Sequence, residues 1–268
     1  MIEGVVLDID GTVARGRELL PGALEVLAGL RERGIRHAFL TNDNRSPVAA
    51  WVDKLAAMGI TAAPEEIVTS ALVAAEVVSE LHAERPVLAV GDIGLIEALE
   101  AKGIDLVSAD EAGRAEVVVM GKDPAFDQER LNVVCQAIWG GAEFMATNYD
   151  PKVPTAHGFA PGTGPMVKAV AYATGCEPLV TGKPSKWAGR MAARLLGVAP
   201  ERTLVVGDQL ATDIAMGRAA GMGTALVLTG TSSRADAAEA DESQRPDAII
   251  ESIAELPRLL ERGLEEQA

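Results

Sequence analysis

Short apolar runs alternate with helix-like segments along nearly the whole chain of 268 residues. The first run, residues 2–9, is rich in β-branched residues and almost uninterrupted, which is typical of a parallel strand covered on both faces. The next segment, residues 21–33, repeats leucine at helical spacing and ends before Gly34. Because strands that alternate with helices form parallel sheets, the sequence predicts an α/β protein.

The same patterns predict the other elements of the chain. Strands are expected at residues 36–40, 67–68, 87–90, 117–120, 143–147, 180, 203–206, 224–228 and 248–250. Helices are expected at residues 47–58, 70–82, 93–102, 127–139, 164–174, 185–196, 210–220 and from 252 onward. Residues 148–165 are expected to form a long connecting loop, and residues 234–245 a surface loop or a loose helix.

The charge balance limits the partners. Asp and Glu total 39 against 24 Lys and Arg, a net charge of -15, which disfavours nucleic acid and anionic membranes. An anionic substrate would therefore need a local positive charge from a metal ion, a lysine or a helix N-terminus. The absence of a membrane-length apolar run or a signal-like N-terminus, together with only two cysteines, leads us to expect a cytoplasmic protein.

Polar residues gather where the predicted strands end. In an open parallel sheet, ligands bind beyond the carboxyl ends of the strands, so these residues are the candidates for a site. They are Asp8, Asp10, Gly11 and Thr12 after the first strand, Thr41 and Asn42 after the second, Lys183, Asp208 and Asp213.

Asp8 is the most informative of them, because it lies inside an apolar run where an unpaired carboxylate would cost several kcal/mol. A divalent cation held by Asp8 and Asp208, with Lys183 across a bound anion, would compensate that charge. Oxygen ligands that share phosphate oxygens suit Mg²⁺. Carboxylates, a lysine and a hydroxyl together indicate phosphoryl transfer, in which positioning and charge stabilisation dominate.

Four segments resemble the motifs of the haloacid dehalogenase superfamily of phosphatases, in the family's order. They are Asp8-Ile9-Asp10-Gly11-Thr12, Thr41-Asn42, Gly182-Lys183-Pro184 and Gly207-Asp208-Gln209-Leu210-Ala211-Thr212-Asp213. Two further segments resemble the p-nitrophenyl phosphatase-like subgroup, which has a type II α/β cap inserted between the second and third motifs. They are Ala146-Thr147-Asn148-Tyr149-Asp150 and Pro161-Gly162-Thr163-Gly164. The resemblance extends over essentially the whole chain. Asp43 departs from it, because the subgroup commonly has Asn or Ser there.

The resemblance implies a role for each matching residue. Asp8 would be the nucleophile that forms an aspartyl-phosphate, and Asp10 the acid that protonates the leaving oxygen and later the base that activates water. Lys183 would neutralise charge, and Asp213 would orient it or a metal-bound water. The phosphate-binding positions would be Gly11, Thr41, Asn42 and Lys183, and the metal-binding positions Asp8, Asp10 through its carbonyl, Asp208 and Asp213.

The resemblance also implies a Rossmann-like core of residues 1–80 and 178–268 with an inserted cap of residues 81–177. A closing cap leaves little room for a protein or polynucleotide, so small phosphorylated metabolites are expected. Nucleotides, sugar phosphates, glycerol phosphate, phosphoglycolate and pyridoxal phosphate all stay open as substrates. Asn148 and Asp150 would contact the substrate or form a hinge, and the loop residue His157 is a weaker candidate for a contact.

Two other functions fit the same residues. A phosphotransferase or phosphomutase would pass the phosphoryl group from Asp8 to an alcohol instead of water. A non-catalytic protein that binds phosphorylated metabolites is less favoured, because a binding site has no need of an acid at Asp10. A monomer and a homo-oligomer both fit the sequence.

Overall fold

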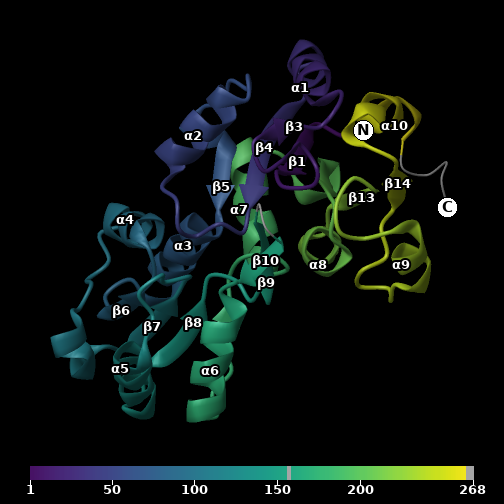
Figure 1. The fold of residues 1–268 in the computed structure, drawn as a ribbon. Helices are drawn as coiled ribbons and strands as arrows, with labels where there is room; N and C mark the ends of the chain where they lie inside the picture. Colours follow the sequence, from purple (N-terminus) through teal and green to yellow (C-terminus); the bar gives the residue numbers. More distant parts are fainter. Residues whose placement is uncertain (156–157, 264–268) are drawn as a thin grey trace. The chain divides into compact units, whose positions relative to one another are not determined.

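The computed structural model describes residues 1–155 and 158–263 and divides into two compact units (Figure 1). Unit 1 comprises Met1–Thr41, Ala49–Val68 and the chain from Lys183 onward. Unit 2 comprises Asn42–Val48 and Thr69–Gly182. Both units are built from strands and helices in alternation, as the sequence predicts.

A six-stranded sheet forms the middle of unit 1. Its order is β14 (Ala248–Ile250), β13 (Gly223–Val227), β12 (Thr203–Gly207), β1 (Gly4–Asp8), β4 (Arg36–Thr41) and β5 (Ile67–Thr69). The pairings from β14 through β4 are parallel, and all five residues of β1 and of β12 are buried. Burial on both faces explains why these strands are continuous apolar runs.

Helices cover this sheet. They are α1 (Ala23–Glu32), α2 (Val48–Ala57), α7 (Lys186–Leu196), α8 (Ala215–Ala220), α9 (Arg234–Glu239) and α10 (Leu256–Arg262). Helix α7 contacts β1 and β4, and α8 contacts β13. The Ser185 hydroxyl accepts a hydrogen bond from the Trp187 N–H at the start of α7, and Gly197 ends the helix in the left-handed conformation, as helix ends favour.

The order of the strands creates a switch point beside β1. From β1 the chain continues to β4 on one side, whereas β12, β13 and β14 follow on the other side. Neighbouring loops at such a point diverge and leave a crevice at the carboxyl ends of the strands. Asp8 ends β1, and Asp208 follows β12 directly, so the fold places both residues at this point.

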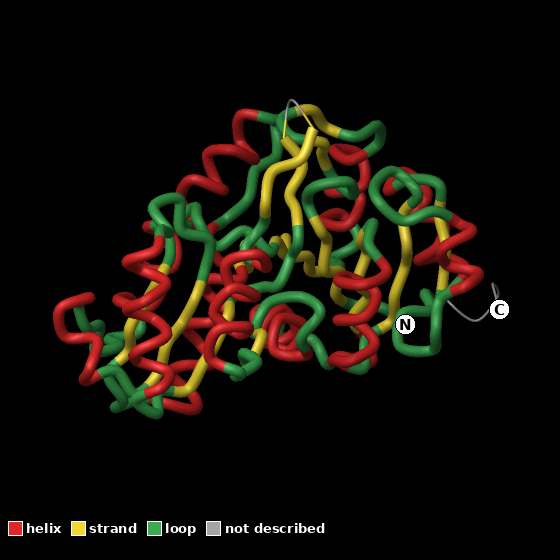
Figure 2. Tube along the Cα trace, turned by 60° about the horizontal axis from the view of Figure 1, so that its bottom comes forward, coloured by secondary structure: helices red, strands yellow, loops and turns green. Residues whose placement is uncertain are grey.

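Unit 2 has a smaller parallel sheet, in the order β11 (Leu179–Val180), β8 (Glu143–Ala146), β7 (Val117–Met120) and β6 (Val87–Val90). Its helices, red in Figure 2, are α3 (Ser70–His82), α4 (Ile93–Ala101), α5 (Gln128–Trp139) and α6 (Gly164–Thr174). Apolar side chains from the strands and from α5 and α6 form one buried core.

Two sequence-based expectations were wrong. Residues 148–165 are not a loop throughout, because β9 (Lys152–Thr155) and β10 (Gly158–Pro161) pair as an antiparallel hairpin. A two-stranded hairpin consists of edge strands only, which tolerate proline, so its sequence carries a weak strand signal. The helix expected from residue 210 begins instead as a π-helical turn, Leu210–Ile214, and continues as α8.

Some short elements give no clear signal in the sequence. They are the hairpin of β2 (Ala14–Arg15) and β3 (Glu18–Leu19) and the 3-10 turns Pro64–Glu66, Ala109–Arg114, Pro200–Arg202 and Ile253–Glu255. Residues 234–245 contain α9. The chain passes from unit 1 to unit 2 between Val68 and Thr69, and α3, which follows directly, packs on α4.

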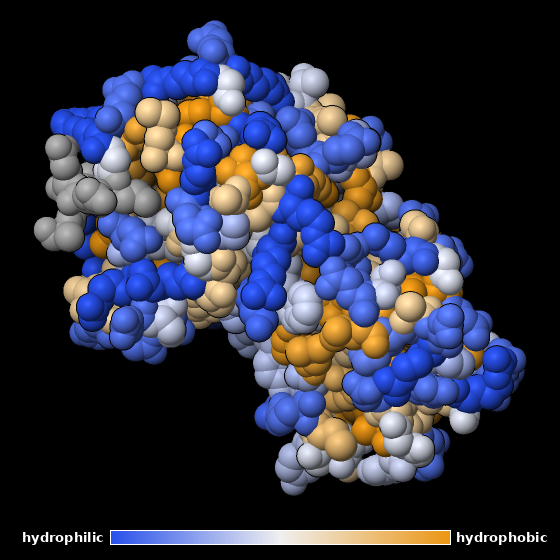
Figure 3. All heavy atoms as spheres, turned by 180° about the vertical axis from the view of Figure 1, so that it is seen from behind, coloured by the Kyte–Doolittle hydropathy of each residue, from blue (hydrophilic) through white to orange (hydrophobic). Residues whose placement is uncertain are grey.

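Hydrophilic residues cover much of the face drawn in Figure 3. Among the described residues, no helix combines the length and the apolar character that crossing a bilayer requires.

Helix α1 offers a matched test of the packing in unit 1. Leu27 is 2% exposed, whereas Leu24, on the same helix, is 43% exposed. Leu27→Ala should lower the free energy of unfolding by about 2 to 5 kcal/mol because it leaves a cavity, and Leu24→Ala by less than about 1 kcal/mol. Urea unfolding measures both changes, and equal losses would contradict the packing described.

Candidate active site

Lys183 lies between two carboxylates in the interior of unit 1. Its Nζ donates hydrogen bonds to Asp8 Oδ1 and to Asp213 Oδ1, each at 2.6 Å, and makes a longer contact of 3.4 Å with the Leu40 carbonyl. The Lys183 side chain is 5% exposed and the Asp213 side chain 1%. Asp213 Oδ2 accepts the Gln209 N–H at 3.1 Å, so both oxygens of this carboxylate have protein partners.

Asp208 is enclosed by a loop that follows β13. The Thr231 N–H donates to Asp208 Oδ2 at 2.6 Å, and the Ser232 N–H donates to the Asp208 carbonyl at 3.0 Å. A Cβ at Gly230 would overlap the Asp208 carboxylate, and one at Gly11 would lie 2.7 Å from it. Gly11 also has φ of 96°, so both the close approach and the backbone conformation require glycine there.

Burial and neighbouring charges shift the pKa values of these groups. Desolvation raises the pKa of Asp8 well above its usual value, although Lys183 acts in the opposite direction. Burial and the negative charge of Asp213 raise the pKa of Asp208 to about 6. Burial alone would lower the pKa of Lys183, but the charges of Asp213 and Asp8 outweigh it and raise that pKa, so the ammonium stays charged.

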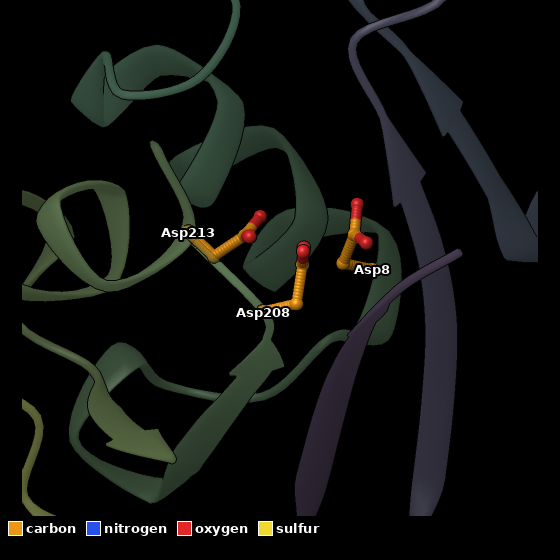
Figure 4. A group of neighbouring side chains, drawn as sticks. All are labelled: Asp8, Asp208 and Asp213. Atoms are coloured by element: carbon orange, nitrogen blue, oxygen red, sulfur yellow. The ribbon is translucent and has the colours of Figure 1, made fainter. Parts of the chain in front are cut away.

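The donor set fits a hard divalent cation. Asp8, Asp208 and Asp213 each bring one carboxylate oxygen within 4.8 Å of the others, and Figure 4 shows Asp208 between the other two. With Lys183, the ionised group carries a net charge of -2, which one divalent cation would neutralise. Among residues 1–155 and 158–263, the buried atoms Asp8 Oδ2 and Asp208 Oδ1 have no hydrogen-bond partner. Such oxygens are the ligands that Mg²⁺ and Ca²⁺ prefer.

The other unit 1 residues that the sequence predicts for the site lie near the ends of strands. Asp10 is exposed, two residues beyond β1, where it forms an isolated bridge with Ala14. The Gly11 carbonyl accepts the Thr229 hydroxyl at 2.6 Å. Thr41 is the last residue of β4 and is 7% exposed.

Three other predicted residues come together within unit 2. Asn42 Nδ2 donates to Asp150 Oδ2 at 3.0 Å, and Asn148 Nδ2 donates to the same oxygen at 2.7 Å. Asn44 joins them by donating to Asn148 Oδ1 at 3.2 Å. We call Asn42, Asn44, Asn148 and Asp150 the asparagine cluster. His157 lies outside the described residues.

Two parts of this arrangement are not predicted by the sequence patterns. The loop Thr229-Gly230-Thr231-Ser232 begins two residues after the end of β13, so inspecting the carboxyl end of that strand would have found it. Asn44 is 2% exposed and links segments more than 70 residues apart in the sequence, which no local pattern reveals.

Family models match both ends of the chain. One described as haloacid dehalogenase-like hydrolase matches residues 5–105, and one described as HAD-hydrolase-like matches residues 180–256. The 5'-nucleotidase YutF of Bacillus subtilis is 34% identical over 253 residues, which cover 94% of this chain and 96% of that protein.

Solved structures resemble the chain over both units. A 4-nitrophenylphosphatase from Thermotoga maritima has a TM-score of 0.88 and 32% identity, covering 96% of this chain and 97% of that one. A glycerol phosphate phosphatase from Mycobacterium tuberculosis, in complex with magnesium, has a TM-score of 0.89 and 36% identity, covering 95% of this chain and 76% of that one.

The raised pKa of Asp208 makes a prediction for the metal-free protein. Between the ordinary pKa of 3.8 and about 6, the folded state binds more protons at Asp208 than the unfolded state does. The free energy of unfolding should therefore fall as pH rises through this window, by up to about 3 kcal/mol.

Asp208→Asn removes this titration and serves as the reference. In EDTA, the stability of the natural protein relative to Asp208→Asn should decrease from pH 4 to pH 7, as measured by urea unfolding. A divalent cation should restore stability at pH 7 in the natural protein more than in the variant. The prediction would be contradicted if the free energy of unfolding of the natural protein in EDTA, relative to that of Asp208→Asn, stays constant or increases with pH.

Proposed function

This chain belongs to the haloacid dehalogenase-like hydrolases, and we propose that it hydrolyses small phosphomonoesters through an aspartyl-phosphate formed on Asp8. The chain is a phosphatase of phosphomonoesters, as its relatives are. The observation that carries the proposed mechanism is the buried contact of Lys183 with Asp8 and Asp213, beside two carboxylate oxygens that have no partner among the described residues.

In the first step, an Asp8 oxygen attacks phosphorus and the ester P–O bond breaks. The electron pair of that bond leaves with the alcohol oxygen, and the Asp10 carboxyl donates a proton to it. Asp10 suits this role because it is exposed two residues beyond the nucleophile. The products of this step are the free alcohol and a phosphorylated Asp8.

In the second step, water attacks the phosphorylated Asp8. The Asp10 carboxylate, deprotonated in the first step, takes a proton from the water. The bond between Asp8 and phosphorus breaks, and its electrons return to the Asp8 carboxylate. Inorganic phosphate leaves, and both carboxyl groups regain their starting states.

Charge stabilisation comes from groups around the nucleophile. The Lys183 ammonium is held at 2.6 Å from Asp8 and would face both the carboxylate and the transferred phosphoryl group. Asp213 keeps that ammonium oriented through its own contact of 2.6 Å. We assign Thr41, Asn42 and the main chain at Gly11 to the phosphoryl oxygens.

Phosphatases of this family use a divalent metal ion, and we infer that it is Mg²⁺ here. Asp8, Asp208 and the main-chain carbonyl of Asp10 would hold it, and Asp213 would act through Lys183, since both of its oxygens already have protein partners. When bound, the ion would neutralise carboxylate and phosphate charge and orient the phosphoryl group.

Unit 2 is proposed to act as the cap that selects the substrate, with residues 81–177 as its main part. The relatives above are named for a nucleotide, an aryl phosphate and glycerol phosphate, all of them small phosphomonoesters. This range supports a small phosphorylated metabolite as the substrate.

Asp8→Asn tests the nucleophile. It keeps the shape of the side chain but removes the attacking carboxylate, so hydrolysis of p-nitrophenyl phosphate should fall by roughly a thousandfold or more. Asp105→Asn changes an aspartate whose side chain is 60% exposed and should keep the natural rate. Turnover near the natural rate by a folded, mass-verified Asp8→Asn protein would overturn the assignment.

Asp10→Asn tests the acid. Alkyl phosphates expel a strongly basic oxygen and need a proton, whereas p-nitrophenyl phosphate expels a stabilised phenolate. In rapid-quench measurements of Asp8 phosphorylation, the variant should lose roughly a hundredfold or more on glycerol phosphate and much less on the aryl ester. Equal losses on both esters would exclude general-acid action by Asp10.

A further inference from the structure

Asn148 is a buried residue of the asparagine cluster whose hydrogen-bonding capacity is fully used. It is 4% exposed. Its Nδ2 donates to Asp150 Oδ2 at 2.7 Å and to the Asn42 carbonyl at 3.0 Å. Its Oδ1 accepts from Asn44 Nδ2 at 3.2 Å and from the Thr147 hydroxyl at 3.3 Å. A carboxamide has two N–H donors and two acceptor positions, so no group of this side chain is left for a substrate.

The partner that matters most is Asn42, which is held through both its main chain and its side chain. The Asn42 carbonyl accepts two hydrogen bonds, from Asn148 and from the Ser70 hydroxyl at 2.7 Å. Its Nδ2 donates to Asp150. Asn42 directly follows Thr41, and both are assigned above to the phosphoryl oxygens.

The same cluster borders the segment that leads to Lys183. The Gly182 N–H donates to the Thr147 carbonyl at 2.8 Å. A Cβ at Gly182 would overlap that carbonyl and would lie 2.9 Å from Asn42 Oδ1. Only glycine therefore fits between residues 42 and 147, directly before the catalytic lysine.

Asn44 links the asparagine cluster to two further segments of unit 2. Its Nδ2 also approaches the Thr163 hydroxyl at 3.3 Å, and its Oδ1 accepts the Lys122 N–H at 2.7 Å. Asn148 is thus fixed by a neighbour that is itself fixed to two further segments of unit 2. Asn44 and Asn148 are buried and every side-chain N and O atom of both has a partner, so displacing either side chain leaves a polar group unpaired.

We propose that Asn148 is a positioning residue that holds the main chain at Asn42 and so fixes Thr41 and Asn42 for binding the phosphoryl group. This inference rests on the proposed function, since it gives Asn148 a role through residues assigned there. Asn148 would act on the binding of the phosphoryl group, which all of the substrates share. Its loss should therefore affect every ester alike.

The test compares Asn148→Ala and Ser70→Ala, which each remove one donor from the Asn42 carbonyl. Asn132→Ala, an exposed position on α5, serves as the control. The readouts are kcat/KM for p-nitrophenyl phosphate, glycerol phosphate and a 5'-mononucleotide, and the inhibition constant of orthovanadate, a phosphoryl mimic. Circular dichroism and thermal unfolding verify that each protein is folded at the assay temperature.

Asn148→Ala should lower kcat/KM by roughly ten- to hundredfold on all three esters by the same factor, because small misplacements of binding groups have effects of this size. Orthovanadate should bind more weakly by a similar factor. Ser70→Ala should show a smaller loss, and the double variant should lose more than the product of the single losses, since the two donors share one acceptor. Asn132→Ala should match the natural protein.

Three results would overturn the inference. They are a loss confined to one ester, unchanged orthovanadate inhibition in a folded variant, and single losses that simply multiply. If Asn148→Ala does not fold, Asn44→Ser removes the anchor on Asn148 Oδ1, and it should show a smaller loss, uniform across the esters. Activity in Asp8→Asn would refute the proposed function instead, so the two failures are distinguishable.

Discussion

The contact between the Lys183 ammonium and the carboxylates of Asp8 and Asp213 is the interaction on which the catalytic end of unit 1 depends. The carboxylates of Asp8, Asp208 and Asp213 lie close to the Lys183 ammonium there, and all four side chains have little exposure to solvent. Removing the ammonium would leave Asp8 and Asp213 buried as unpaired negative charges, which is far more costly than the pair itself. Strand β1 is apolar until it ends at Asp8, and the contact with Lys183 makes this buried carboxylate tolerable.

One lysine does not balance the group, however. Burial is the largest cause of the raised pKa values of Asp8 and Asp208, and the negative charge of Asp213 adds to it. The charges of Asp213 and Asp8 also raise the pKa of Lys183. A phosphatase can use this imbalance, because a site that is too negative on its own becomes receptive to a cation. The cation in turn makes the site receptive to a phosphate ester, which an acidic protein would otherwise repel.

Glycines shape this site as much as its charged residues do. Gly11 and Gly230 let main-chain segments approach Asp208 so closely that a side chain at either position would collide with the carboxylate. In unit 2, Gly182 has the same function beside Asn42 and Thr147. In the proposal above, the asparagine cluster serves the binding of the phosphoryl group, which is common to all esters, so specificity for one ester would rest on other residues.

The sequence alone determined the α/β class, most helix and strand positions and the placing of polar residues at the strand ends, because burial on both faces and helical periodicity are local patterns. Asp8 stood out for the same local reason, a charge within an apolar strand. The tertiary structure decided which groups meet: Asp213 contacts Lys183, one of the two roles that the sequence left open, and the contacts of Thr231 with Asp208 and of Asn44 with Asn148 come from the structure alone. It also decided the hairpin of β9 and β10, whose strands stabilise each other only when paired. These contacts join residues far apart in the chain, and their energy depends on distance and burial, which no single segment encodes.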